Sequence, residues 1–292
     1  MHSRLFLAAF ACLVASSVFA DEAAIIAALK AKGVTFTETK GQVTGLTLKK
    51  DPGLTEADYQ QIRQLTHLKS FSCTIGFDDA ALKAVAGLPE LELFSANGAA
   101  LTDEGLRTLA SFKALKRVAY FHPPKGLKGT GLSALAELPG LEHVTMAGST
   151  DFADEGMAAI GKLTQLKELR TWHYGVSAGG LQSLQSLKGL KSLMLGQRLG
   201  TSQPPTLTDD TMPLLTGLAS LESLSLGEAR LSLKGLGQLK KLPHLKKLTL
   251  DAVLIPEAEL AQLKTLLAPV EIKHTAPTPD VEKRITGLPA AK

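Results

Sequence analysis

A leucine pattern that recurs about every 24 residues constrains this chain more than any other feature of its sequence. Its cleanest copy is Leu231–Leu250, LSLKGLGQLKKLPHLKKLTL, in which leucines three residues apart share one face of a short helix. The copy ends in Leu-x-x-Leu-x-Leu, whose final alternation is typical of a short strand. One such helix–turn–strand unit cannot bury its own apolar face, so the copies must stack on one another.

Nine copies of this pattern follow one another along the 292 residues of the chain. In several copies a Thr or Ser follows the opening apolar residue and an acid comes next, as in Thr102-Asp103. That order predicts a hydroxyl cap on a helix, followed by negative charge near the helix dipole. The copies fill residues 54–275, lie 23 to 31 residues apart and open at Leu54, Phe77, Leu101, Leu127, Phe152, Val176, Leu207, Leu231 and Ile255. The pattern predicts an α/β solenoid.

Residues 1–20 are predicted to be a secretory signal peptide. Arg4 precedes an apolar run, and Val18-Phe19-Ala20 supplies a small-x-small cleavage site after Ala20. The apolar run is too short for a transmembrane anchor. We therefore expect a secreted or periplasmic protein whose mature chain begins at Asp21.

The two ends of the mature chain are expected to differ from the repeats. Residues 21–53 predict an N-terminal cap, with a helix over 21–33 and a hairpin around Lys40-Gly41. Residues 276–292 contain three prolines and few large apolar side chains, which is typical of a loose C-terminal tail.

Charge and cysteine content exclude two further classes. Without Arg4 the chain has 31 basic and 28 acidic residues (32 − 1 = 31), a net charge near +3 that is too small to indicate nucleic-acid binding. Without Cys12, one cysteine remains, Cys73, at a strand position that points inward. An internal disulfide is therefore impossible, and the thiol is predicted to be packed and inert.

The repeats resemble leucine-rich repeat proteins of the LTDxGL type. The third copy reads LTDEGL, and Gly41–Leu48 matches the G-x-V-x-G-L-x-L strand that opens exported bacterial, planctomycete-like members. The repeats are also similar to the ribonuclease-inhibitor-like and GALA-like classes. The resemblance covers about residues 22–275 and implies a right-handed α/β horseshoe with a parallel concave sheet, convex helices and a binding role. The chain departs from some relatives in having one asparagine, Asn97, and no cysteine caps.

No motif in the sequence indicates catalysis. HExxH, CxxC, GxSxG and phosphate-loop patterns are missing, so we expect no enzyme activity and no cofactor. His122, His143 and His173 lie in consecutive repeats. The equivalent positions of His122 and His173 would be roughly 10 Å apart at a strand spacing of about 4.8 Å, so no metal site is predicted.

Residues that point outward from the strands are mostly small, but those of the third to fifth repeats are not. Aromatic residues and Arg are the types enriched at binding hot spots. The predicted ligand-binding residues are Arg117, Phe121, His122, His143, Glu168, Arg170, Trp172, His173 and Tyr174. Tyr120 is excluded because it takes an inward strand position. In the alternative interpretation, Phe121 and Tyr174 fill loop cores and Arg170 pairs with Glu168 or another neighbour.

The predicted function is a non-enzymatic exported scaffold that binds another protein through the concave face. One alternative is a carbohydrate or cell-envelope polysaccharide ligand, with Trp172 and Tyr174 stacking on sugar rings. The other is a passive structural component. Two proline-containing loops, residues 121–126 and 200–206, lie on the same edge and either rim the site or reflect tolerated length variation.

Overall fold

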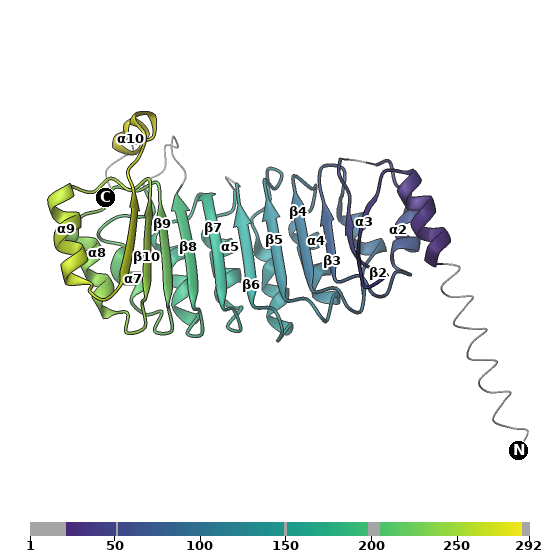
Figure 1. Cartoon of the computed structure of the whole chain (residues 1–292), viewed down its shortest axis with the longest axis horizontal. Helices are drawn as coiled ribbons and strands as arrows, with labels where there is room; N and C mark the ends of the chain where they lie inside the picture. The colour runs from purple at the N-terminus through teal and green to yellow at the C-terminus, as the bar shows by residue number, and fades with distance from the viewer. Residues whose placement is uncertain (1–21, 51, 149–150, 198–204, 288–292) are drawn as a thin grey trace, which may run out of the picture.

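A computed structural model describes residues 22–50, 52–148, 151–197 and 205–287. In these ranges every repeat adds one strand to a single sheet and one helical segment to the layer behind it, so the chain forms an elongated stack (Figure 1). The predicted signal peptide and Asp21 lie outside the described residues.

The sheet has eleven strands in sequence order, and all neighbours except β1 and β2 pair in parallel. The strands are β1 (Thr35–Thr39), β2 (Gln42–Thr47), β3 (Ser70–Cys73), β4 (Leu93–Asn97), β5 (Arg117–Phe121), β6 (His143–Ala147), β7 (Glu168–Tyr174), β8 (Ser192–Gln197), β9 (Ser223–Gly227), β10 (Lys247–Asp251) and β11 (Glu271–Thr275).

The helical layer mixes α-helices with 3₁₀ turns, and a further helix over residues 22–31 precedes the sheet. The α-helices are α2 (Glu56–Ile62), α3 (Asp79–Ala84), α4 (Asp103–Thr108), α5 (Asp154–Gly161), α6 (Ala178–Ser183), α7 (Met212–Leu215), α8 (Leu233–Leu236), α9 (Glu257–Leu266) and α10 (Pro279–Thr286). The 3₁₀ segments are η1 (Leu109–Ser111), η2 (Thr130–Glu137), η3 (Leu184–Ser186) and η4 (Gly237–Lys241).

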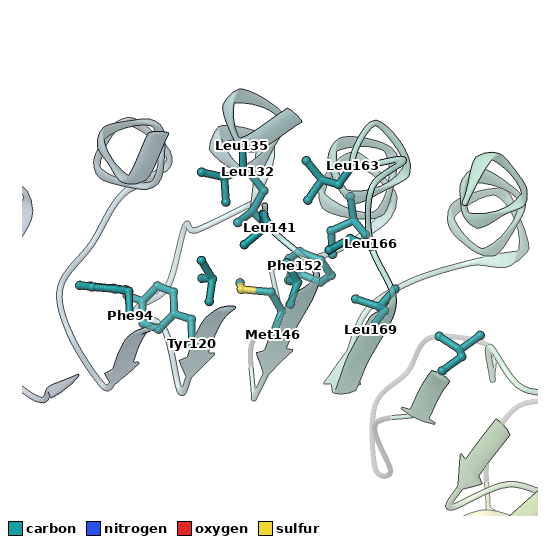
Figure 2. Close-up of a cluster of buried hydrophobic side chains, with 14 of the residues drawn as sticks. Phe94, Tyr120, Leu132, Leu135, Leu141, Met146, Phe152, Leu163, Leu166 and Leu169 are labelled. Carbon is teal, nitrogen blue, oxygen red and sulfur yellow. The ribbon is translucent and has the colours of Figure 1, made fainter. Parts of the chain in front are cut away.

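The strand register predicted from the leucine pattern is the register of the structure. Val144 of β6 pairs with Leu169 of β7, which pairs with Leu193 of β8, and all three side chains are buried. Leucines from the helical segments meet them from the other side, so the core is one continuous layer between strands and helices (Figure 2). Burying each leucine contributes roughly 1.5–3 kcal/mol before conformational entropy is subtracted. The predicted α/β solenoid is confirmed.

Two predicted inward side chains are also confirmed. Cys73 is 2% exposed, its thiol lies 3.6 Å from the carbonyl oxygen of Ser95, and burial raises its pKa. The buried Tyr120 hydroxyl donates to the carbonyl oxygen of Ala99 at 2.5 Å and accepts from the Leu101 N–H at 3.3 Å. Both residues therefore belong to the core.

An aspartate at the third position of several repeats makes a contact that the sequence did not predict, because it reaches the next repeat. Asp79 accepts from the backbone N–H and the hydroxyl of Thr102 at 3.0 and 2.5 Å. Asp154 accepts from the same two groups of Ser177 at 2.7 and 2.5 Å. A Cβ placed on Gly180 would lie 2.5 Å from the Asp154 carboxylate, which explains the recurring glycine. We call this set the aspartate ladder: Asp79, Asp103, Asp154 and Asp209.

The N-terminal hairpin agrees with the prediction, whereas the C-terminal segment does not. Lys40 and Gly41 both have positive φ, 55° and 78°, as a two-residue hairpin turn requires. Residues 276–292 were expected to be loose, but Pro279–Thr286 forms α10, and Ile285 is 3% exposed. The Thr278 side chain caps this helix and Ile285 anchors it, which composition alone did not reveal.

Candidate functional site

The strand register brings most of the predicted ligand-binding residues onto neighbouring strands of one face. Arg117 of β5 pairs with His143 of β6, which pairs with Glu168 of β7. Farther along the same strands, Phe121 pairs with Ala147, which pairs with Trp172. We call the following set the β5–β7 patch: Arg117, Phe121, His143, Glu168, Arg170 and Trp172.

An aromatic pair forms the apolar part of the patch. The ring centroids of Phe121 and Trp172 lie 6.0 Å apart at an interplanar angle of 54°. The two residues are on strands that flank β6, and the intervening side chain is only a methyl group, that of Ala147. The small residue leaves space for both rings to approach, in the tilted geometry that aromatic pairs favour.

Arg170 supports the same tryptophan from its own strand. Its Cζ lies 5.8 Å from the Trp172 ring centroid, within the range of a cation–π contact. Its Nη2 donates to Sδ of Met194 on β8 at 3.5 Å. Of the alternative pairings, Arg170 thus contacts its neighbours Trp172 and Met194, and no ion pair joins it to Glu168 among the described residues. Trp172 is half-buried, and Phe121 and Arg170 hold its ring in place.

The histidines of the region contact polar partners. Nδ1 of His143 lies 3.0 Å from Oε2 of Glu168 within the patch. Nε2 of His173 lies 3.2 Å from Oε2 of Glu228. Nδ1 of His122 lies 2.9 Å from Oδ1 of Asn97.

His122 directly follows β5 and His173 is the last residue but one of β7, and both have positive φ, 49° and 58°. Gly98 and Gly148 occupy equivalent positions with φ of 70° and 80°. L-residues pay roughly 1–2 kcal/mol for this conformation. Because the left-handed residue recurs in several repeats, it is a feature of the repeat and not of one site. The two histidines border the β5–β7 patch at its edge.

Tyr174 corrects the prediction, because it does not belong to the exposed set. Its side chain is 3% exposed, and burial raises the pKa of its hydroxyl, which has no hydrogen-bond partner within the described part of the chain. Strand β7 extends beyond Trp172, and a register shift between Trp172 and Tyr174 turns the tyrosine inward. Tyr174 then lines a small enclosed space with Met146, Phe152 and Trp172.

Three contacting residues were missed by the sequence prediction: Asn97, Met194 and Glu228. Asn97 and Met194 point outward from β4 and β8, so their strand positions already made them neighbours of the patch. Glu228 follows β9 and lies two strands from His173. A search along the register for partners of each charged residue would have found the first two.

The proline-containing loops are described in part. The N–H of Gly126 donates to the Asp151 carboxylate at 2.7 Å, and Pro124 lines a cavity of about 370 Å³ beside α4. Residues 200–204 lie outside the described ranges, whereas Thr206 is buried and its hydroxyl donates to the Val176 carbonyl. The prediction that these loops rim the site therefore stays a prediction.

Two larger cavities lie away from the β5–β7 patch. One of about 760 Å³ lies between α2 and α3, and one of about 720 Å³ lies between Ile285 of α10 and the loops of the last repeats. Among the residues that the structure describes, no three His, Cys, Asp or Glu side chains are grouped to hold a metal ion. In the same ranges, no helix has the length and apolarity needed to cross a bilayer.

Comparisons with known proteins agree with the fold. No protein-family model matches the chain. Human F-box/LRR-repeat protein 12 is 34% identical over 119 residues, which are 40% of this chain and 36% of the human protein. The chain thus matches about a third of that relative's length.

Two solved internalins of Listeria monocytogenes are similar in structure. The internalin inlF matches with a TM-score of 0.52 and 19% identity, over 75% of this chain and 57% of the internalin. Internalin C2 gives a TM-score of 0.45 and 17% identity, over 76% of this chain and 84% of that one. The inlF match, together with the eleven-stranded sheet and its helical layer, identifies the fold as an α/β leucine-rich repeat solenoid.

Proposed function

We propose that this chain is a non-enzymatic binding scaffold that engages another protein through the β5–β7 patch, on the concave side of the solenoid. The observation that carries the proposal is the contiguous group formed by Phe121, Trp172 and Arg170, with ring centroids 6.0 Å apart and the guanidinium 5.8 Å from the indole. Aromatic and Arg side chains of this kind supply most of the binding energy at protein interfaces.

The mutual contacts of these side chains favour tight binding. A free Trp or Arg side chain loses rotamer entropy when a partner immobilises it, at roughly 0.5–1.5 kcal/mol each. Phe121 and Met194 already restrict Trp172 and Arg170 before any partner arrives. The patch is thus partly preorganised.

The burial of Tyr174 argues against the carbohydrate alternative. That alternative required Trp172 and Tyr174 to stack on sugar rings, and the tyrosine is now a core residue. Of these two residues, only Trp172 could still stack on a sugar ring, and Phe121 and Arg170 already contact the Trp172 ring. The protein-binding function is therefore the better supported of the two.

The test compares capture of partners from native cell envelopes by the mature wild-type chain, Trp172→Ala and Ser225→Ala. Ser225 lies on β9 of the same face, outside the patch. A protein held by the wild type and Ser225→Ala, and lost with Trp172→Ala, is the expected result. Since the chain has one tryptophan, quenching of its fluorescence by envelope polysaccharides would indicate the carbohydrate alternative instead. If neither a captured protein nor fluorescence quenching is observed, the passive structural component is the remaining function.

Export also belongs to this proposal. The predicted cleavage site after Ala20 and the LTDxGL-type repeats support a secreted or periplasmic, bacterial-type protein. N-terminal sequencing of the exported protein should give Asp21 as the first residue. A lipid on Cys12, or an intact Met1 in exported material, would contradict it.

A further inference from the structure

The charged groups of the β5–β7 patch are not balanced. Its carboxylate, Glu168, lies 3.0 Å from the His143 imidazole, and both side chains are little more than a quarter exposed. Its two guanidiniums have no such partner. Arg170 contacts the Trp172 ring and the Met194 sulfur, neither of which carries an opposing charge. In the described part of the chain, no carboxylate lies within 4.0 Å of Arg117 or Arg170.

Some basic residues just before the strands do meet an acid. Lys116, one residue before Arg117, lies 3.0 Å from Glu92. Lys246, one residue before β10, lies 2.7 Å from Glu222. Both pairs bridge neighbouring repeats.

Lys247 of β10, by contrast, has no carboxylate within 4.0 Å among the described residues, so an unmatched cation alone does not define the patch. Arg117 and Arg170 are distinguished because they share strands β5 and β7 with the aromatic pair Phe121 and Trp172.

We propose that the partner presents an acidic polypeptide segment, whose carboxylates contact Arg117 and Arg170 while an apolar side chain packs on Phe121 and Trp172. This inference rests on the proposed function and specifies the chemistry of its partner. Both arginines are exposed, and a guanidinium binds a carboxylate through two parallel hydrogen bonds. With Glu168 directed at His143, the patch has a net positive charge that complements such a segment.

The register sets the spacing of the two contacts. Arg117 and Arg170 lie two strands and two residues apart, which corresponds to roughly 12 Å between Cα atoms at standard strand spacing and rise. An extended segment rises about 3.3 Å per residue, so acids three to four residues apart match the arginines. The aromatic pair lies beyond them along the strands.

The experiment pans phage-displayed random dodecapeptides on the full mature chain, and counter-selects against Trp172→Ala. We expect the recovered peptides to be rich in Asp and Glu. Their affinity should fall about tenfold or more with Arg117→Gln/Arg170→Gln, and should weaken with added salt, as for exposed charge pairs. The control is Lys247→Gln, which removes one exposed positive charge from the same face on β10 and should leave affinity unchanged. Thermal unfolding of each variant confirms that it is folded.

Each other outcome is decisive. Neutral or basic peptides that depend on Trp172 would overturn the acidic segment and leave the proposed function standing. Acidic peptides that bind Arg117→Gln/Arg170→Gln as tightly as wild type would also overturn it. Failure to recover any Trp172-dependent peptide would overturn both the acidic segment and the proposed function. If polygalacturonate binds instead of peptides, the patch is assigned to an acidic polysaccharide.

Discussion

Strands β5–β7 and β8–β10 share one register and one core, yet their outer faces differ. Toward the helices, Leu169 of β7 and Leu224 of β9 are both fully buried. Away from the helices, β7 presents Arg170 and Trp172, whereas β9 presents Ser225 and Gly227 at the equivalent positions. Since the inward residues alone bury the core, the outward ones are free to vary without loss of the fold. The core therefore does not require the large side chains gathered at the outward positions of β5–β7, which is why the proposed function places the binding surface there.

The largest expected effect tests whether the two regions share one core. Leu169→Ala and Leu224→Ala should each lower the free energy of unfolding by about 2–5 kcal/mol, since each removes a fully buried side chain. Urea unfolding followed by circular dichroism measures both. A cost below about 1 kcal/mol at either position would show that the core is not equally packed in the two regions.

The second effect separates binding from stability within the patch. Trp172→Ala should weaken partner binding by about 2 kcal/mol or more, while unfolding free energy changes by about 1 kcal/mol or less because the side chain is only half-buried. Ser225→Ala should change neither quantity. Titration calorimetry and urea unfolding of the same two variants give the comparison, and equal binding losses in both would refute it.

The aspartate ladder gives a smaller effect on stability. Asp154→Ala should lower the free energy of unfolding by about 1–2 kcal/mol, because the capped N–H and hydroxyl of Ser177 lose their acceptor. Asp210→Ala is the matched control. Its carboxylate is exposed and 3.5 Å from Lys234, so its loss should cost about 0.5 kcal/mol or less. Similar costs for the two variants would mean that the ladder adds nothing to inter-repeat stability.

The smallest effect is on pH dependence. Burial favours a raised pKa for Asp103, but N–H donors from Gly131 and Lys128 outweigh it, so its pKa lies below the usual value. A lowered folded-state pKa stabilises the fold above the unfolded-state pKa, and this stabilisation is lost as pH falls below about 4. Asp103→Asn should therefore lose less stability than wild type between pH 5 and pH 3. Urea unfolding at the two pH values measures this difference, and an equal loss in the two proteins would contradict it.

The sequence predicted the parts of the fold that depend on a fixed period. Alternation along a strand decides which face each side chain takes, so Cys73 and Tyr120 were assigned inward correctly. Tyr174 was assigned to the wrong side because the left-handed residue His173 and the register shift beside it interrupt the alternation. No leucine spacing encodes that interruption.

The ladder was missed for a different reason. An acid at the start of a helix already has a local explanation in the helix dipole, and its actual acceptor role spans 23 residues, as between Asp79 and Thr102. Likewise, the contact of Arg170 with Met194 depends on a choice between two neighbouring strands. The sequence defined which residues share the face, whereas side-chain pairing across strands required the structure.

The aspartate ladder also limits the order in which repeats can be joined. In the LTDxGL motif the aspartate faces the repeat that follows, and the glycine accommodates the aspartate of the repeat before. Each ladder aspartate is accordingly followed, one repeat later, by Gly105, Gly131, Gly180 or Gly235. Where Ala178 and Leu233 replace the aspartate, the next repeats have Thr211 and Glu259 in place of glycine. Gly156 is the exception: it follows Gly129, and Phe152 and the Lys128 backbone crowd it instead.

Neighbouring copies are therefore matched pairs and not interchangeable modules. Transplanting the third repeat to a position directly before the ninth would set Asp103 against Glu259, two carboxylates in the space of one. A junction at the start of a repeat makes one new aspartate–glycine contact, whereas a cut between the aspartate and the glycine of one motif makes two, because each aspartate meets the glycine of the next motif. Duplications, deletions or designed extensions of this solenoid should therefore take their boundaries at the start of a repeat, and should place a repeat with a ladder aspartate only before a repeat with the glycine.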